Sequence, residues 1–593
     1  MNTKTSAPES NRRLRGTALI SVLIALMLTL LLEALDQTIV GTALPRIIGS
    51  LQGFDRYIWV VTAYTLASTT MIPLVGKLSD QFGRKWFLVI GTAIFLLGSA
   101  LSGASQSMNQ LIAFRAVQGL GGGIGIALVF TVVADIFPPA ERARWQGIFG
   151  SVYGVANVIG PTLGGWLTDH GPLVGNLVTD ATRWRWIFYI NLPLGILALA
   201  ALLIYLPTTL SIPSNRLSGW AAIRRIDVLG AVLASAATIC LLLGLTWGSN
   251  QIYDWNSLQV IGVLVASGVL YVLFILTERF VAEPILPLNL FRNQVFAVAS
   301  LLSLLQLMVL ISLVIYLPLF LQGVLGESAT NSGEVITPLT ISTVVGSLIA
   351  ATIMASRKRY QMITIVGALI MTIGVFLLTR MTASTSLLEA AIYMVIAGLG
   401  LGSFFSILTL AAQNSLPRAR LGVGTGAVRY LGQLGSVLGV AIVATVVNQT
   451  LANDIVKRLP ANAKQQLTPQ GLQAATNPQV LVNSTYHSTL VHTAENYAVK
   501  NATVHVPPGP QHDAIAAQVI QQVHTLLNQV FEALRLSFAV ALQHGFITIL
   551  VFCGLAIIAT FFLKDVPMKK QYDEAPAEKG APIGKEENAA PLA

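Results

Sequence analysis

Fourteen long apolar runs constrain this chain more than any other feature of its sequence. They are centred near residues 28, 66, 95, 121, 156, 196, 237, 267, 308, 344, 371, 399, 434 and 553. Each has the roughly 20 residues that an α-helix needs to cross about 30 Å of hydrocarbon. Only 10% of the 593 residues are charged, which excludes a water-soluble globule of this length. The sequence therefore predicts an all-α integral membrane protein with fourteen transmembrane helices.

The lysines and arginines predict which side of the membrane each loop occupies. Basic clusters such as Lys77, Arg84 and Lys85 recur on the side of the amino terminus, and the loops of the other side carry few. Cytoplasmic loops carry the excess of positive charge, so we expect both termini in the cytoplasm. The net charge of +10 is then a consequence of topology, and no nucleic-acid partner is expected.

Enzymatic activity is not expected from the residues present. The two cysteines, Cys240 and Cys553, fall inside predicted spans, so the chain lacks the residues for a disulfide framework or a metal site. It also lacks the glycine-rich loop that binds nucleotide phosphates. We therefore expect no cofactor and no metal.

An internal repeat relates two parts of the chain. Sliding the sequence against itself by 279 residues superimposes five glycines and a proline without a gap. These pairs are Gly119 with Gly398, Gly121 with Gly400, Gly123 with Gly402, Pro138 with Pro417, Gly147 with Gly426 and Gly160 with Gly439. The chain is therefore predicted to consist of two similar halves, with two additional spans between them. Transporters use such repeats to build a central site that opens alternately to each side.

This arithmetic predicts a division into five parts. They are a cytoplasmic tail (1–15), an N-terminal six-helix bundle (16–207), a linker with two additional transmembrane helices (208–285), a C-terminal six-helix bundle (286–564) and a second cytoplasmic tail (565–593).

Four local motifs carry a family resemblance. The loop after the second run reads GKLSDQFGRK at 76–85, the fourth run begins LIAFRAVQG at 111–119, and WRWIFYIN occupies 184–191. The fifth run contains the small-residue pattern Gly154, Gly160, Pro161, Gly164 and Gly165. Together these resemble the loop signature, buried-arginine motif and antiporter motif of the major facilitator superfamily, in its fourteen-span drug:proton antiporter branch. The resemblance covers nearly the whole chain and implies two six-helix bundles plus two extra helices, acting in export rather than uptake.

The loop after the second run is the predicted conformational gate. We expect Gly76 and Gly83 to permit a tight reversal, and Asp80 to pair with Arg84 or with Arg144 of the next cytoplasmic loop. Such a cluster would latch the cytoplasmic side. The alternative is ordinary positive-inside anchoring with one acceptor.

The fifth run is predicted to pack closely against its neighbours. Its glycines allow helix backbones to approach one another, and Pro161 removes an intrahelical hydrogen bond and bends the helix.

Two carboxylates, Glu33 and Asp36, stand within the first run, where a charge costs about 3 kcal/mol. At about 1.5 Å of rise per residue, Asp36 lies roughly 12 Å and Arg115 roughly 10 Å below the outer surface, so the two share a level. Glu33, one turn deeper, shares its level with Arg429. The sequence therefore predicts two acid–base pairs, Asp36–Arg115 and Glu33–Arg429, that face a central cavity.

These pairs have a structural and a functional interpretation. As structural elements they would only hold helices together. In the functional interpretation, one carboxylate gains and loses a proton as the bundles rock. Burial raises the pKa of a carboxylate and a nearby guanidinium lowers it, so moving the two groups apart or together would change its protonation. We expect Asp36 to carry the proton, Arg115 to tune it, and Glu33 to assist or to recognise a cation. Arg429 and Glu334 are further cavity candidates, and Glu334 is alternatively an interfacial residue in contact with water.

A long polar segment, 448–541, separates the last two spans on the outer side. After prolines at 507–510, Ile515, Val519, Val523, Leu526, Val530, Leu534 and Phe538 recur at helical spacing and predict an amphipathic helix that leads into the last span. Its apolar stripe would either pack on the outer ends of neighbouring spans or receive an extracytoplasmic partner.

The predicted function is proton-coupled antiport that exports amphipathic or cationic drugs, from a multi-pass protein of the plasma (bacterial inner) membrane. This is the chemistry of multidrug efflux and antibiotic resistance, with protons, lipid and a small amphipathic molecule as partners. Two alternatives remain open. One is export of a lipid or another physiological metabolite by the same fold, and the other is a non-transporting membrane sensor or scaffold.

Overall fold

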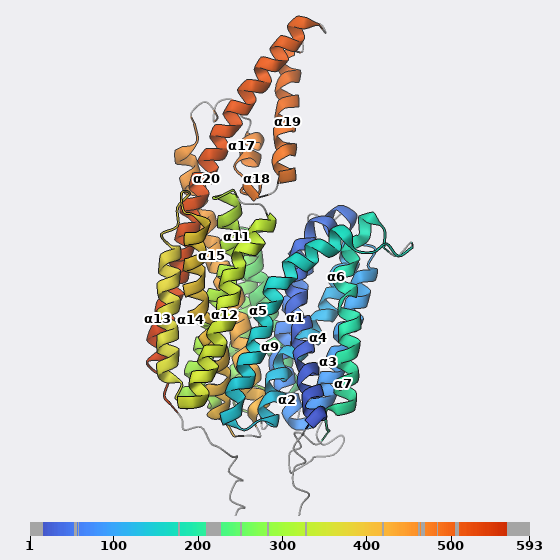
Figure 1. The fold of residues 1–593 in the computed structure, drawn as a ribbon, viewed down its shortest axis with the longest axis vertical. Coiled ribbons are helices and arrows are strands. Elements are labelled where there is room, and N and C mark those ends of the chain that lie inside the picture. The colour runs from blue at the N-terminus through green and yellow to red at the C-terminus, as the bar shows by residue number, and fades with distance from the viewer. Residues whose placement is uncertain are drawn as a thin grey trace, which may run out of the picture.

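The computed structural model describes most of the chain between residues 16 and 565. The described residues are 16–51, 56, 58–175, 178–208, 227–249, 252–281, 284–326, 329–357, 359–417, 420–460, 463, 469–482, 484–503 and 509–565. Both predicted tails and most of the polar connection at 208–226 thus lie outside the described residues, apart from 208 and 565. The described elements are helices, arranged side by side (Figure 1).

The helices of the first part of the chain are α1 (Gly16–Leu51), α2 (Ile58–Phe82), α3 (Arg84–Ala104), α4 (Met108–Ile136), α5 (Pro139–His170), the 3₁₀ helix η1 (Asp180–Arg185), α6 (Trp186–Tyr189) and α7 (Asn191–Tyr205). Two helices follow, α9 (Val228–Ser249) and α10 (Leu258–Glu278). The rest comprises η2 (Leu288–Arg292), α11 (Gln294–Gly323), α12 (Ala329–Arg357), α13 (Gln361–Leu378), α14 (Leu387–Asn414), α15 (Leu421–Arg458), α17 (Pro469–Ala475), α18 (Gln479–Val482), α19 (Ser484–Thr503) and α20 (Pro510–Thr560).

Thirteen helices of the described residues are long and apolar enough to cross a membrane. The fourteenth predicted span, α5, has 32 residues but falls outside this set because glycine and polar residues lower its hydropathy. It packs against α1 and α12, between the two halves of the molecule, so protein neighbours cover part of its surface (Figure 1). A helix buried between protein neighbours does not need the apolar surface that a lipid-facing helix needs.

The glycines of the internal repeat have equivalent neighbours in the two halves. On α4, a Cβ at Gly121 would lie 2.4 Å from the backbone nitrogen of Phe95 on α3. At the equivalent position of α14, a Cβ at Gly400 would lie 2.2 Å from the backbone nitrogen of Met371 on α13. The glycines on either side face α2 in the first half and α12 in the second. Both helices are therefore built into their bundles by the same close backbone contacts.

The helix order places both ends of the membrane region together. Helix α1 begins and α20 ends at the same end of the bundle (Figure 1). The loop between α2 and α3 lies at that end too, and it carries the basic residues that predict a cytoplasmic location. We refer to this end as the inner end and to the opposite one as the outer end.

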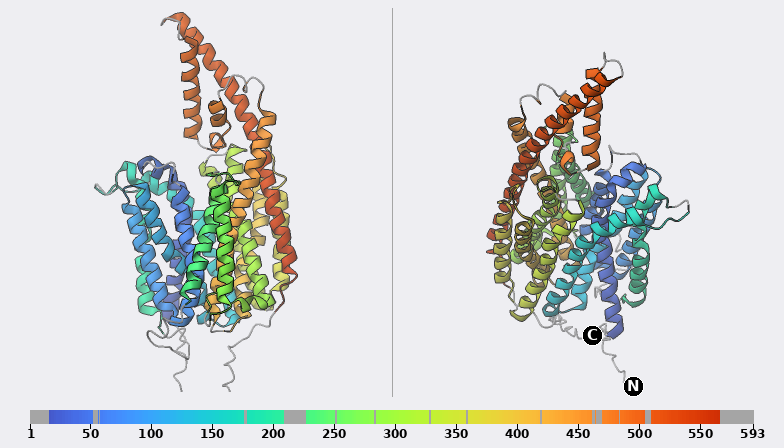
Figure 2. Two further views of the ribbon diagram at one scale, coloured as in Figure 1. Left: turned by 180° about the vertical axis from the view of Figure 1, so that it is seen from behind. Right: turned by 45° about the horizontal axis from the view of Figure 1, so that its top comes forward.

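The predicted outer helix is continuous with the last span. Helix α20 runs for 51 residues without a break, about 75 Å at 1.5 Å per residue, and rises with α19 beyond the membrane bundle (Figures 1 and 2). Its stripe residues Leu526, Val530, Leu534 and Phe538 are buried in the apolar core that α11 and α15 share. The stripe is therefore covered within the chain over its lower part.

Candidate functional site

The structure brings Asp36 and Arg115 into contact. Arg115 on α4 donates from Nη1 to Oδ2 of Asp36 on α1 at 2.5 Å. The side chains are 1% and 0% exposed, so this is a fully buried ion pair. Helix α4 is started by Ser107, whose side chain accepts from the backbone N–H of Gln110, and Arg115 follows two turns later. The shared depth counted from the sequence thus corresponds to a real contact.

Further polar groups complete the coordination of this pair. Gln118 donates from Nε2 to Asp36 Oδ1 at 2.8 Å and accepts from Arg115 Nη1 at 2.8 Å. Asn191 donates to the same Asp36 oxygen at 3.4 Å and to Ser99 Oγ at 3.0 Å. Asp36 therefore accepts from three side chains, and each of its oxygens is occupied. These hydrogen bonds offset the cost of removing the two charges from water, whereas a buried charge without such partners would be strongly destabilising.

Sequence reasoning quoted Gln118 and Asn191 within motifs but gave them no role. Both are polar residues inside apolar runs, which is the signal that could have found them. Two aromatic rings lie near the Arg115 guanidinium: Phe188 of the segment 184–191 is 5.7 Å from it, and Tyr64 of α2 is 4.4 Å from it. These ring faces give the cation a second set of favourable contacts.

Glu33 does not pair with Arg429, and that prediction is wrong. Glu33 is 2% exposed and lies against α4 at Gly125, where an added Cβ would fall 1.6 Å from Glu33 Oε1. Its Oε2 has no hydrogen-bond partner within the described part of the chain. Arg429, on α15, lies against a different part of α4, with its guanidinium 3.7 Å from the Phe130 ring and Nη2 donating to Thr409 at 3.2 Å.

The reason for this error is geometric. Gly125 and Phe130 are five residues apart, which corresponds to about 7.5 Å along α4 and about 140° around it. Counting rise along separate helices gives depth, but it gives neither the direction of a side chain nor the lateral position of its helix.

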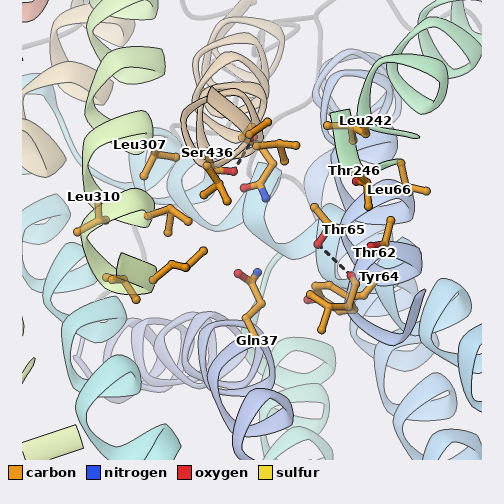
Figure 3. Close-up of a pocket in the computed structure, with 18 of the residues that line it drawn as sticks. Gln37, Thr62, Tyr64, Thr65, Leu66, Leu242, Thr246, Leu307, Leu310 and Ser436 are labelled. Atoms are coloured by element: carbon orange, nitrogen blue, oxygen red, sulfur yellow. Dashed lines mark hydrogen bonds between the residues drawn. The ribbon is translucent and has the colours of Figure 1, made fainter. Parts of the chain in front are cut away.

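A cavity of about 390 Å³ lies between the two halves (Figure 3). It is lined by residues of α1, α2, α4, α9, α11, α14 and α15, among them Arg115 and Arg429. Val61 is in the first turn of α2 and Ser249 ends α9, so the cavity reaches the outer ends of these helices. Glu33 and Asp36 are not among its lining residues. Arg115, the partner of Asp36, does line the cavity, and Tyr64 lies beside it there.

The inner end is closed by a contact that crosses between the halves. Asp80 at the end of α2 accepts from the backbone N–H groups of Gly422 and Val423 at 2.9 and 2.8 Å. These are the second and third residues of α15, whose own preceding residue provides no side-chain cap. Asp80 thus satisfies two of the open donors at a helix N-terminus, where a negative charge is stabilised.

Asp80 pairs with Arg84 and not with Arg144. Arg84 donates from Nη1 to Asp80 at 2.6 Å and from Nε to Asp135 of α4 at 2.7 Å. Arg144 is exposed. Asp135 belongs to this ion-pair cluster and was missed by sequence reasoning, and its signal was a lone acid at the inner end of an apolar run.

The two gate glycines have different roles. Gly83 adopts a φ of +92°, a conformation that favours glycine, and it starts α3 directly after α2. Gly76 is inside α2, where a Cβ would lie 2.9 Å from the carbonyl oxygen of Gly422. Its predicted role in the reversal is therefore wrong, because it permits close approach of α2 to α15 instead.

Helix α5 uses some of its glycines for close contact. A Cβ at Gly160 would lie 1.9 Å from Thr38 Oγ1 of α1, and one at Gly154 would lie 2.2 Å from Val344 of α12. Gly165 has nothing within 4 Å, so it is not a contact glycine in this state. Gly164 is buried, and the side chain of Pro161 lies outside the described residues. Glu334 falls in the first turns of α12, before its apolar window, and its side chain lies outside the described part as well.

Comparison with known proteins agrees with this architecture. The family model of the Major Facilitator Superfamily matches residues 26–440, which include the buried pair, the residues that line the cavity except Ala441, and both sides of the inner contact. The chain belongs to the major facilitator superfamily. It is a multi-pass membrane protein of a transporter family, and members of this family are not enzymes.

Relatives within the superfamily include two proteins of Bacillus subtilis (strain 168). The chain is 37% identical to "Multidrug resistance protein 3" over 435 residues, covering 73% of this chain and 80% of that protein. It is 34% identical to "Multidrug transporter protein MdtP" over 568 residues, covering 94% and 95%. The crystal structure of the human organic anion transporter MFSD10 (TETRAN) shares the fold, with a TM-score of 0.51 at 16% identity, covering 73% of this chain and 94% of that one.

Proposed function

We propose that this transporter is a proton-coupled antiporter that exports amphipathic compounds, and that Asp36 carries the proton. The observation that supports this most is the fully buried Asp36–Arg115 pair at the wall of a cavity formed by both halves. Protonation of Asp36 would release Arg115, and a guanidinium without its carboxylate has to find another acceptor or reach water. A change at this one atom therefore alters the energy of the cavity wall and can favour one arrangement of the halves.

The inner contact supports alternating access. The two bonds from α15 to Asp80 join the halves at the inner end, while the cavity reaches the outer ends of α2 and α9. We interpret this arrangement as the outward-facing state of the exporter. Proton uptake from the outer side would then precede opening of the inner contact, which is the order that an exporter driven by an inward proton gradient requires.

The lining of the cavity favours amphipathic over cationic substrates. It includes two guanidinium groups and apolar side chains such as Leu307 and Leu310, and none of its described residues is a carboxylate (Figure 3). A cation would lack a direct partner in this state, whereas a neutral or anionic amphiphile would find both apolar surface and donors. Recognition of a cation would require Asp36 or Glu33 to become accessible in another state.

Glu33, a buried carboxylate one turn from Asp36, is proposed to assist proton coupling. The glycines of α5 are proposed to let the halves slide at their interface. The bacterial inner membrane is the proposed location. An extracytoplasmic partner of segment 448–541 would have to bind the polar outer surface of α19 and α20, because the lower apolar stripe of α20 is already covered.

Reconstitution in inside-out vesicles tests the proposal. With an acidic interior, the wild-type protein should take up a fluorescent amphiphile, and a protonophore should abolish the uptake. Asp36→Asn should lose uptake driven by the proton gradient but retain exchange of labelled for unlabelled substrate, because exchange requires no net proton movement. The matched control is Asp169→Asn, since Asp169 forms an exposed pair with Arg46 at 3.0 Å and should leave both activities unchanged.

Two results would replace the proposal. Gradient-driven uptake by Asp36→Asn at the wild-type rate would remove Asp36 as the carrier. Movement of fluorescent lipid without movement of any dye would favour lipid export, the alternative that the sequence left open.

A further inference from the structure

Helix α9, one of the two helices inserted between the halves, presents one face to the cavity. Its lining residues are Leu242, Thr246 and Ser249. They are spaced by four and three residues, so they lie on one stripe of the helix. Figure 3 shows Leu242 and Thr246 beside Thr65 and Leu66 of α2, across the cavity from α11. The inserted helix thus lines the same space as the helices of the two bundles.

Hydrogen bonds fix the position of this face. The hydroxyl groups of Thr238 and Tyr430 of α15 are 2.6 Å apart, and Tyr271 of α10 approaches Tyr430 at 2.7 Å. Near the outer end, Asn448 of α15 donates to the backbone oxygen of Ser249 at 3.4 Å. The two inserted helices, α9 and α10, are therefore hydrogen-bonded to α15 near Tyr430, and α9 is bonded to it again near Asn448. Because Tyr430 directly follows Arg429, this attachment sets the distance between the α9 face and a charged residue of the cavity.

The other face of α9 does not line the cavity. Leu229 is 58% exposed on the surface of the bundle, where lipid would lie, and is about 100° to 160° around α9 from the three lining residues. Towards α2, Leu242 is buried in an apolar cluster that also contains Ile72 and Val75. The cavity face and the lipid face of α9 can therefore be changed separately.

We propose that α9 selects substrates, with Thr246 limiting the size of the amphipathic molecule that the cavity accepts. This inference rests on the proposed export function and specifies which residue of the inserted pair acts in it. Thr246 is partly exposed to the cavity and stands above Leu242, which provides an apolar base. A larger side chain at 246 would fill space between α2 and α15 and exclude bulky molecules first, and a smaller one would admit them.

The test measures two neutral amphiphiles of different size, N-phenyl-1-naphthylamine and the larger Nile red. Uptake into inside-out vesicles and binding to the purified full-length protein are both recorded. Thr246→Phe should lower the ratio of Nile red to N-phenyl-1-naphthylamine transport by about tenfold, the discrimination that a few carbon atoms provide in an apolar pocket. Thr246→Ala should raise the ratio, because the smaller side chain admits bulkier molecules. Leu229→Phe adds a large side chain to the lipid face of the same helix and should leave the ratio unchanged.

The outcomes separate the two proposals. If the wild type transports both dyes and neither Thr246 variant alters the ratio in binding or transport, the role of α9 is refuted and the export function stands. An equal shift in Leu229→Phe would also refute it, because the effect would then come from general disturbance of α9. Should Thr246→Phe fail to fold, Thr246→Ala and the binding ratio decide. A wild type without gradient-driven uptake of either dye would refute the export function itself.

Discussion

The substitution Asp80→Asn should shift the transporter towards a state that is open at the inner end. Asp80 accepts hydrogen bonds from the backbone of Gly422 and Val423 at 2.9 and 2.8 Å, and these bonds join α2 of one half to α15 of the other. They exist only while the halves meet at this end. Asparagine has one acceptor oxygen and no charge, so it can replace one of the two bonds and only in a weaker form.

The expected magnitude follows from these contacts. A hydrogen bond to a charged group contributes about 1.5–3 kcal/mol, and a negative charge at a helix N-terminus adds about 0.3–2 kcal/mol. Loss of one bond, and weakening of the other, should cost the closed state about 2–4 kcal/mol. The equilibrium between the states would then change by about 30- to 700-fold, since each 1.4 kcal/mol is a factor of ten.

Distances between spin labels can measure this shift. Labels at Arg144→Cys and Arg420→Cys would stand on exposed residues of the two halves near the inner end. The chain has only two cysteines, Cys240 and Cys553, which are first replaced by alanine. Asp80→Asn should add a population at longer distance to the distribution of the labelled protein.

The matched control for this experiment is Asp135→Asn. Asp135 binds the same Arg84, at 2.7 Å, but both residues belong to the N-terminal half. Its loss should lower the stability of that half without moving the labels apart. The reasoning would be refuted if Asp80→Asn left the distances as in the wild type, or if Asp135→Asn produced the same shift.

Two further predictions concern packing and are checked by thermal unfolding of the purified protein. Gly121→Ala should lower stability by about 1–3 kcal/mol, because a Cβ at that position would lie 2.4 Å from the backbone nitrogen of Phe95, whereas Gly165→Ala has no atom within 4 Å and should be neutral. Equal melting temperatures for the two variants would contradict this. Leu534→Ala should cost about 2–5 kcal/mol because Leu534 is fully buried, and Leu536→Ala, at 36% exposure, should cost under about 1 kcal/mol; a reversed order would show that α20 presents another face to the bundle.

The sequence predicted those features of the site that depend only on position along the chain or on depth in the membrane. Asp36 and Arg115 could be assigned a common depth because hydropathy marks the ends of each span and the helix has a fixed rise. The repeat between the halves was visible because backbone contacts such as that of Gly121 exclude any side chain. Thirteen of the predicted spans were found, and α5 differed because its neighbours are protein, which relaxes the need for apolar residues.

The neighbours of these residues on other helices could not be predicted from helical rise, because rise gives only depth. Glu33 was assigned to Arg429 but lies against Gly125, and Asp80 was assigned to side chains although its contact across the halves is with the backbone of α15. Backbone donors leave no trace in the sequence, since every residue except proline has one. The sequence of the inserted helix α9 likewise predicts only an apolar span. Its position at the cavity became visible through the tertiary structure, in which Thr238 of α9 contacts Tyr430 of α15.

The amino-acid sequence by itself determined that this protein spans the membrane many times, that it has two related halves, and that an acid and an arginine are buried at one level. Tertiary structure alone decided which helix faces which, and so where the cavity, the inner contact and the α9 wall are. The physical reason is that helical rise and lipid thickness fix a residue's depth, whereas its orientation and neighbours depend on packing between segments far apart in the chain.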